Sequence, residues 1–310
     1  MSVKKVSKKF VKNDFSTIGL TLILYSLFVL FIPTIIDQLF KVVEIGDFYG
    51  FELKTIIKML LIIIGTIFPF LILKFSIRKN AIVEKEKIKI PFFDVLCRFL
   101  MFFSLTSIAI FATTTIAAYF DIPGEFISSI GLRLDDKVMD DVIYLAMFIV
   151  VTPIIEEIAF RGILLKALSK YGKYFALFAS AIVFSLAHGS FIEMIPAFIM
   201  GMLLNKIALR YKSIKPTIFI HILFNLSLYI LIRIPEKYSF YTTIGLAFVY
   251  ILSIVLYVTH VYKPITLYKL DSFNDVNKLF YGNGLVIVSF ITFIGHSIFI
   301  ILLETIEILI

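Results

Sequence analysis

The sequence TPIIEEIAFRGIL, residues 152–164, places three ionisable side chains inside strongly apolar sequence. Two are the adjacent carboxylates of Glu156 and Glu157, and the third is the guanidinium of Arg161. On insertion scales, a charged side chain at the centre of a membrane helix costs about 2.5–3.5 kcal/mol. Ionisable groups in such surroundings therefore indicate a functional site or a buried ion pair.

Two later motifs supply other groups that can do chemistry. His188 ends the sequence FSLAH, and His221 and Asn225 begin and end HILFN. A spacing of four puts His221 and Asn225 on one face of a helix, one turn apart. The other two histidines are His260, at the end of a span, and His296, in the final helix. Neither belongs to a comparable motif.

The charged stretch is predicted to belong to one long helix over residues 141–171. Pro153 should kink this helix rather than end it, because neighbouring helices can satisfy the carbonyl that a proline leaves free. Gly172 then makes a turn, and Glu156 and His188 each lie 16 positions from it. At about 1.5 Å per residue the two side chains reach the same height, so a carboxylate and an imidazole would face one another.

Together these groups suit the hydrolysis of an amide. A buried Glu156 beside His188 can take a proton from water and deliver hydroxide to a carbonyl. His221 and Asn225 can donate hydrogen bonds to the resulting oxyanion. The same groups also suit a metal, because Glu156, His188 and His221 could ligate zinc and leave a position open for water. The sequence requires no cofactor, and a divalent metal such as zinc stays a candidate.

Several of these residues also have a purely structural interpretation. Glu157 and Arg161 fit a structural ion pair as well as a supporting role, because a buried charge needs a partner. Asn225 fits equally well as a hydrogen-bond donor that joins membrane helices. Packing is the default role of Phe184, which is one of 34 phenylalanines. The joint spacing of the motifs, rather than any single residue, favours function.

Composition places the chain in a membrane. Sixty per cent of its 310 residues are apolar and its mean hydropathy is +1.00, as in polytopic membrane proteins. The net charge of +8 lies in short basic runs beside apolar segments, without the pattern of a nucleic-acid-binding surface. We therefore expect an integral, multi-pass membrane protein in contact with the lipid bilayer and no nucleic-acid partner.

Apolar runs of about 20 residues predict an all-α polytopic transmembrane bundle with eight or nine spans. The predicted spans are residues 17–36, 55–75, 95–119, 142 to the charged stretch, 174–188, 194–209, 217–234, 242–259 and 285–309. Basic and acidic loops alternate between them, which predicts a cytoplasmic N-terminus. The polar stretch over residues 263–283 is expected to be a cytoplasmic loop.

The three motifs, in this order and at these separations, resemble the signatures of the CPBP family. That family includes type II CAAX prenyl endopeptidases, bacteriocin-processing enzymes and Abi-type membrane proteins of bacteria. The resemblance covers residues 142–235. Carried onto this chain, it implies that Glu156 and His188 activate the attacking water and that His221 and Asn225 stabilise the oxyanion.

The resemblance also implies supporting roles for Glu157, Arg161 and Phe184. Family members have been described both as metalloproteases and as metal-free, glutamate-dependent enzymes, and this sequence favours neither. The chain would then consist of an N-terminal three-helix membrane region (1–120), a CPBP-like protease core (141–235), and C-terminal helices with a cytoplasmic loop (236–310).

The function expected from this reasoning is an intramembrane endopeptidase in a bacterial cell membrane. It would hydrolyse a peptide or membrane-protein substrate near the cytoplasmic membrane face. Two other classes stay open, namely a membrane scaffold that regulates a membrane-bound partner such as a sensor kinase, and an ion-coupled transporter. A transporter is disfavoured because the two halves of the chain show no repeat. The sequence also lacks HExxH and G-x-S-x-G motifs, which argues against zincin-like and serine proteases.

Overall fold

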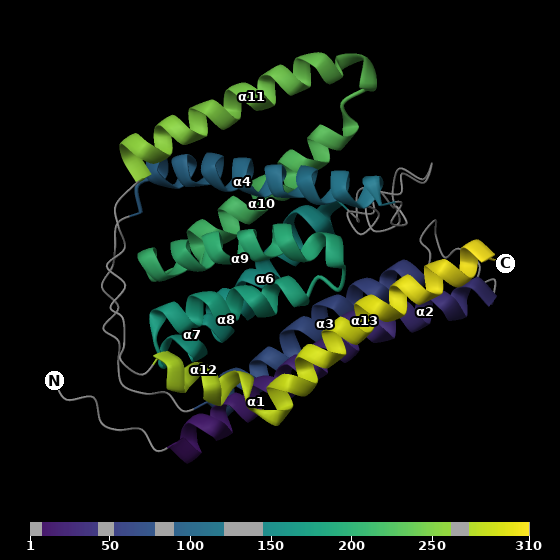
Figure 1. The fold of residues 1–310 in the computed structure, drawn as a ribbon, viewed down its shortest axis with the longest axis vertical. Coiled ribbons are helices and arrows are strands. Elements are labelled where there is room, and N and C mark those ends of the chain that lie inside the picture. Colours follow the sequence, from purple (N-terminus) through teal and green to yellow (C-terminus); the bar gives the residue numbers. More distant parts are fainter. Residues whose placement is uncertain (1–7, 43–52, 78–89, 121–144, 262–272, 310) are drawn as a thin grey trace.

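The computed structural model describes residues 8–42, 53–77, 90–120, 145–261 and 273–309. Within these residues the chain forms helices and turns and contains no strand, which confirms the predicted all-α bundle. The helices fall into two groups (Figure 1). The first group contains the helices between residues 8 and 76 together with the helix of residues 284–309, which run side by side, and the second contains the helices between residues 92 and 256.

The first group is built around a long N-terminal helix. This helix consists of α1 (Lys8–Ser26), a π-helical segment η1 (Leu27–Phe31) and α2 (Ile32–Val42). Two other helices pack along it, α3 (Leu53–Ser76) and α13 (Gly284–Leu309).

Small and polar residues line the contact between α1 and α13. A Cβ atom added to Gly19 would lie 2.5 Å from the backbone carbon of Leu285, so the two backbones are in direct contact there. The hydroxyls of Ser26 and Thr292 are 3.1 Å apart. Such close approach through small residues is a common way to join helices in a bilayer.

The second group holds the sequence motifs. Its helices are α4 (Phe92–Tyr119), α8 (Lys173–Leu186), α9 (Phe191–Tyr211), α10 (Lys215–Arg233) and α11 (Ser239–Leu256), with the short segments η5 (Glu236–Tyr238) and η6 (Tyr257–Val261). In this group α9 packs against both α4 and α8.

The stretch that carries Glu156 is a single helix with two π-helical segments. We call residues 145–169 the motif helix; it runs through η3 (Met147–Val151), α6 (Thr152–Glu156), η4 (Glu157–Leu164) and α7 (Leu165–Ser169). Pro153 does not end it, as the sequence predicts. The turn that follows contains Gly172 with a φ of 131°, a conformation that favours glycine. The first predicted residues, 141–144, lie outside the described residues.

Seven helices of the described chain are long and apolar enough to cross a membrane, and they coincide with seven of the nine predicted spans. They are Lys8–Ile36, Met59–Ser76, Phe92–Tyr119, Phe191–Tyr211, Lys215–Arg233, Glu236–His260 and Gly284–Leu303. The other two predicted spans, which run from residue 142 to the charged stretch and over residues 174–188, are not among these seven helices. The motif helix carries four charged side chains, Glu156, Glu157, Arg161 and Lys166, and α8 is only 14 residues long.

The stretch over residues 263–283 is not the simple loop that the sequence analysis expects. Its second half forms α12 (Phe273–Tyr281), whereas residues 263–272 lie outside the described chain. The ring of Phe280 is fully buried and lies 5.1 Å from that of Phe15 and 5.3 Å from that of Phe175. The average polarity of the stretch conceals this helix, because only one of its faces is apolar.

The N-terminal helix is tied to the turn after the motif helix. The Tyr171 hydroxyl donates a hydrogen bond of 2.5 Å to Asp14, and the Lys170 ammonium lies 3.9 Å from the same carboxylate. Burial and the neighbouring Asp14 carboxylate raise the pKa of the Tyr171 phenol. The Phe15 ring packs edge-on against Tyr171, with centroids 4.9 Å apart. This end of α1 is therefore held in place by both polar and aromatic contacts.

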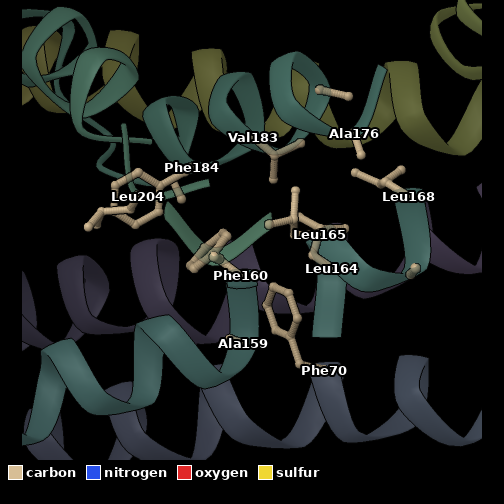
Figure 2. Close-up of a cluster of buried hydrophobic side chains, with 14 of the residues drawn as sticks. Phe70, Ala159, Phe160, Leu164, Leu165, Leu168, Ala176, Val183, Phe184 and Leu204 are labelled. Atoms are coloured by element: carbon tan, nitrogen blue, oxygen red, sulfur yellow. The ribbon is translucent and has the colours of Figure 1, made fainter. Parts of the chain in front are cut away.

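An apolar core joins the two groups of helices (Figure 2). Its central residue is Phe160 of the motif helix, which is fully buried. The Phe160 ring lies 5.2 Å from that of Phe70 on α3 and 5.1 Å from that of Phe184 on α8. Phe160 thus fixes the motif helix against the first group and against α8 at the same time.

The close contact at Gly19 leads to a prediction about stability. Gly19→Ala should lower the thermal unfolding midpoint and the yield of purified protein, because the added methyl group meets the backbone of α13. Overpacking of this kind costs about 1–3 kcal/mol. The matched control is Gly245→Ala on α11, where an added Cβ meets nothing within 4 Å and the helix should gain slightly. Equal unfolding midpoints for both variants would contradict the described contact.

Candidate active site

Glu157 lies at the centre of the polar cluster. Its side chain is fully buried, and its Oε1 atom accepts two hydrogen bonds. One comes from the Arg161 guanidinium at 2.9 Å, which is the ion pair that the spacing of four predicts. The other comes from His221 Nδ1 at 3.0 Å. Glu157 therefore connects the motif helix to α10 through a single oxygen, a link that the sequence analysis did not anticipate.

The buried Arg161 is supported by an aromatic ring. Its guanidinium carbon lies 4.1 Å from the centroid of the Phe184 ring on α8, within the range of a cation–π interaction. The Nε and Nη2 atoms of Arg161 have no hydrogen-bond partner within the described residues. The charge of Arg161 is thus stabilised by one carboxylate and one ring, and Phe184 does more than fill space.

His221 lies between the two glutamates. A carboxylate can only accept a hydrogen bond, so Nδ1 of His221 carries a proton and donates it toward Glu157. The opposite nitrogen, Nε2, is 3.8 Å from Oε2 of Glu156. The side chain of Glu156 is 21% exposed, whereas that of Glu157 is fully buried. Of the two adjacent carboxylates, only that of Glu156 reaches accessible space.

His188 is oriented by the backbone of its own chain segment. Its Nδ1 atom lies 2.8 Å from the carbonyl oxygen of Phe184, and because a carbonyl only accepts, the proton sits on Nδ1. The lone pair of the neutral ring is then on Nε2. The charge of Glu156 acts on His188, but no hydrogen bond joins the two side chains in the described structure. Glu156 and His188 therefore lie within electrostatic reach of one another, without a hydrogen bond between them in the described structure.

Asn225 makes a bond between helices. Its Nδ2 atom donates to the carbonyl of Phe148 at 2.8 Å. In the π-helical segment η3 the N–H of Thr152 donates to the carbonyl of Met147, five residues earlier. In the same pattern the next carbonyl, that of Phe148, would accept from residue 153, but Pro153 has no N–H. The hydrogen bond from Asn225 reaches the Phe148 carbonyl at the position where this pattern has no N–H to offer. An amide nitrogen carries two hydrogens, so one of them is left for a second acceptor.

The cluster only partly fits a metal. In both His221 and His188 the Nδ1–H donates to an acceptor oxygen, so the lone pair of the neutral ring is on Nε2. Metal-binding histidines show the same arrangement. In the described part of the chain, however, no three His, Cys, Asp or Glu side chains come close enough together to hold an ion. The candidate set Glu156, His188 and His221 is therefore not assembled as a metal site, and we derive no step through a metal.

Three side chains near the site were missed by the sequence analysis. Tyr25 and Glu193 both lie within electrostatic reach of Glu156. His296 lies against Gly189, the residue after His188, where an added Cβ would be 3.0 Å from its Nδ1 atom. The sequence carries no signal for Tyr25 or His296, because α1 and α13 are far from the motifs along the chain and only the fold brings them there.

Comparison with known proteins identifies the segment that holds these motifs. Residues 139–227 match a family model described as type II CAAX prenyl endopeptidase Rce1-like. The chain thus contains a segment that is similar to this family. The matched segment contains Glu156, His188, His221 and Asn225 and excludes the first group of helices. No curated protein and no solved structure shows significant similarity to the chain.

The Rce1-like match and the apolar helices agree on the class of protein. With seven helices that are long and apolar enough to cross a bilayer, the chain is a multi-pass integral membrane protein. The family that residues 139–227 match is one of endopeptidases, which agrees with a membrane-bound hydrolase.

The buried ion pair leads to a second prediction. Arg161→Ala should strand the Glu157 carboxylate in an apolar interior, and breaking a buried pair in this way costs about 3–5 kcal/mol. We expect the yield of membrane-inserted protein and its thermal unfolding midpoint to fall together. The control is Lys166→Ala at an exposed position of the same motif helix, which should leave both unchanged. Normal yield and stability of the Arg161→Ala protein would mean that the pair is not a structural requirement.

Proposed function

We propose that this protein is an intramembrane endopeptidase that uses a water molecule activated by Glu156. The observation that carries the proposal is the placement of His221 between two carboxylates. Its Nδ1 is held by the buried Glu157 at 3.0 Å, and its Nε2 lies 3.8 Å from the partly exposed Glu156. Glu157 is thus occupied by structural hydrogen bonds, whereas Glu156 is available to act on a water molecule.

Glu156 acts as the general base in this proposal. Its carboxylate takes a proton from water, and the resulting hydroxide attacks the carbonyl carbon of the scissile peptide bond. His188 lies within electrostatic reach of Glu156. With its proton fixed on Nδ1 by the Phe184 carbonyl, His188 offers the lone pair of Nε2 to the same water.

His221 and Asn225 face the charge that develops on the carbonyl oxygen. Glu157 orients the His221 ring and stabilises it when it is protonated, so that Nε2–H can donate to the oxyanion. The second N–H of Asn225 is a further donor. When the tetrahedral intermediate collapses, the C–N bond breaks and the leaving amine takes the proton from Glu156.

We further propose that the site opens toward the cytoplasmic membrane face. The turn after the motif helix is flanked by Lys166, Lys170 and Lys173, and basic residues near membrane helices favour the cytoplasmic side. The same rule gives a cytoplasmic N-terminus. In a bacterial cell membrane, the expected substrate is a membrane-associated peptide, such as a bacteriocin leader or a peptide pheromone, or a membrane-bound regulator.

The decisive substitution is Glu156→Gln. An amide has nearly the size of the carboxylate and is cheaper to bury, so the variant should fold and insert normally while losing all turnover. Peptides from membranes of cells that make the native protein or the variant can be compared by mass spectrometry. Products that depend on Glu156 should disappear. The control is Glu236→Gln in η5, outside the polar cluster, which should leave the peptide pattern unchanged. An unchanged peptide pattern with normal levels of the Glu156→Gln protein would refute the proposed function.

A separate prediction concerns metal. Because three donors are not gathered in the described cluster, we expect purified active protein to hold far less than one equivalent of zinc. It should also keep its activity after treatment with a chelator. The measurement is metal content by mass spectrometry alongside activity before and after chelation. Stoichiometric zinc whose removal abolishes activity, and whose return restores it, would show that the cluster rearranges to bind a metal.

A further inference from the structure

Tyr25 brings a hydroxyl from outside the Rce1-like segment to the motif helix. It lies at the end of α1 and is only 4% exposed. Its ring packs against Phe70 on α3 and Phe160 on the motif helix, each with centroids 5.8 Å apart, and against Phe293 on α13 at 6.2 Å. Rings from three helices therefore fix the position of this side chain.

The same packing places Tyr25 beside Glu156. Phe160, which its ring contacts, follows Glu156 by four residues on the motif helix, close to one turn of that helix. The charge of Glu156 acts on the Tyr25 phenol. His221 reaches Glu156 from α10 in the second group of helices, and Tyr25 comes from α1 in the first group (Figure 1). Polar groups from both parts of the fold thus converge on this carboxylate.

The Tyr25 hydroxyl is not used by the rest of the described structure. No hydrogen bond from it is present among the described residues, and its oxygen is not one of the fully enclosed side-chain atoms that lack a partner. Buried tyrosine hydroxyls usually have a partner. An unused hydroxyl that keeps accessible surface next to a partly exposed carboxylate is placed to bind a small polar molecule between the two.

We propose that Tyr25 is a further catalytic residue, whose hydroxyl holds the attacking water against Glu156. This inference rests on the proposed function. One hydrogen of the water is transferred to Glu156 and the other donates to Nε2 of His188, while the Tyr25 hydroxyl donates a hydrogen bond to one lone pair of the water oxygen, so that the other lone pair faces the peptide carbonyl. Tyr25 keeps its own proton throughout. The water oxygen enters the new carboxyl group, and the proton on Glu156 leaves with the amine.

This role explains why the first group of helices matters to the chemistry. In the proposed mechanism the Rce1-like segment supplies the base and the oxyanion donors, but the group that orients the water comes from α1. Phe70 and Phe293, on α3 and α13, hold the Tyr25 ring. The active site would therefore be complete only when these helices are packed on the motif helix.

The test is Tyr25→Phe, which keeps the ring and its packing and removes only the hydroxyl. We expect the rate of product formation per molecule, measured on the Glu156-dependent peptides by mass spectrometry, to fall about tenfold, as for the loss of one hydrogen bond. Protein level and thermal unfolding midpoint should not change. The control is Tyr250→Phe, which removes a hydroxyl that lies 3.1 Å from that of Ser107, between α11 and α4. It should cleave at the native rate.

The outcomes separate this inference from the proposed function. Native turnover by Tyr25→Phe, with Glu156→Gln inactive, would overturn the role of Tyr25 alone. A loss of product matched by an equal loss of protein would overturn it as well, because turnover per molecule would be unchanged. Peptide products that persist in Glu156→Gln cells would overturn the proposed function and, with it, this inference.

Discussion

The packing of the motif helix against α8 and α10 depends on one buried oxygen, Oε1 of Glu157. A charge in this apolar interior has to be matched by an opposite charge or by hydrogen bonds, and Oε1 receives both Arg161 and His221. Arg161 in turn needs the Phe184 ring beneath it. The bonds from Glu157 to Arg161 and His221, and the contact of Arg161 with the Phe184 ring, together fix the rotation of the motif helix and its position against α8 and α10. The neighbouring Glu156 is then the carboxylate that this network does not neutralise.

The π-helical segments of the motif helix are the second determinant of the site. They widen the backbone around Pro153 and shift its hydrogen bonds, so that the Phe148 carbonyl accepts from Asn225 on another helix. Segments of this kind are often found at functional sites. Here the irregular backbone costs little in the bilayer, because a side chain from α10 satisfies the exposed carbonyl.

The sequence allowed much of this arrangement to be predicted, because most of the cluster comes from consecutive helices. The turn at Gly172, the pair Glu157–Arg161 and the proximity of Glu156 to His188 all follow from local spacing. The bond between Glu157 and His221 could not be predicted, because helical periodicity does not give the relative rotation of two helices.

Elements remote from the motifs were the least predictable. Tyr25 lies more than a hundred residues before Glu156 and belongs to a helix whose composition is that of any membrane span. Its position depends on how α1, α3 and α13 pack, which no local pattern encodes. Helix α12 was missed for a different reason: its few apolar residues, Phe280 among them, lie on one face of a polar stretch, and an average over the stretch hides them.

The pairing of α1 with α13 has a consequence for biosynthesis. Ser26 and Thr292, whose hydroxyls meet across this contact, are 266 residues apart. During synthesis α1 enters the bilayer first, and its contact face with Gly19 stays covered only by lipid until α13 has been made. Phe293, which holds the Tyr25 ring, arrives with that last helix. A nascent chain therefore carries the motifs before α13 packs on α1, and in the proposed mechanism the Tyr25 ring gains its last aromatic neighbour only when the final helix has been made.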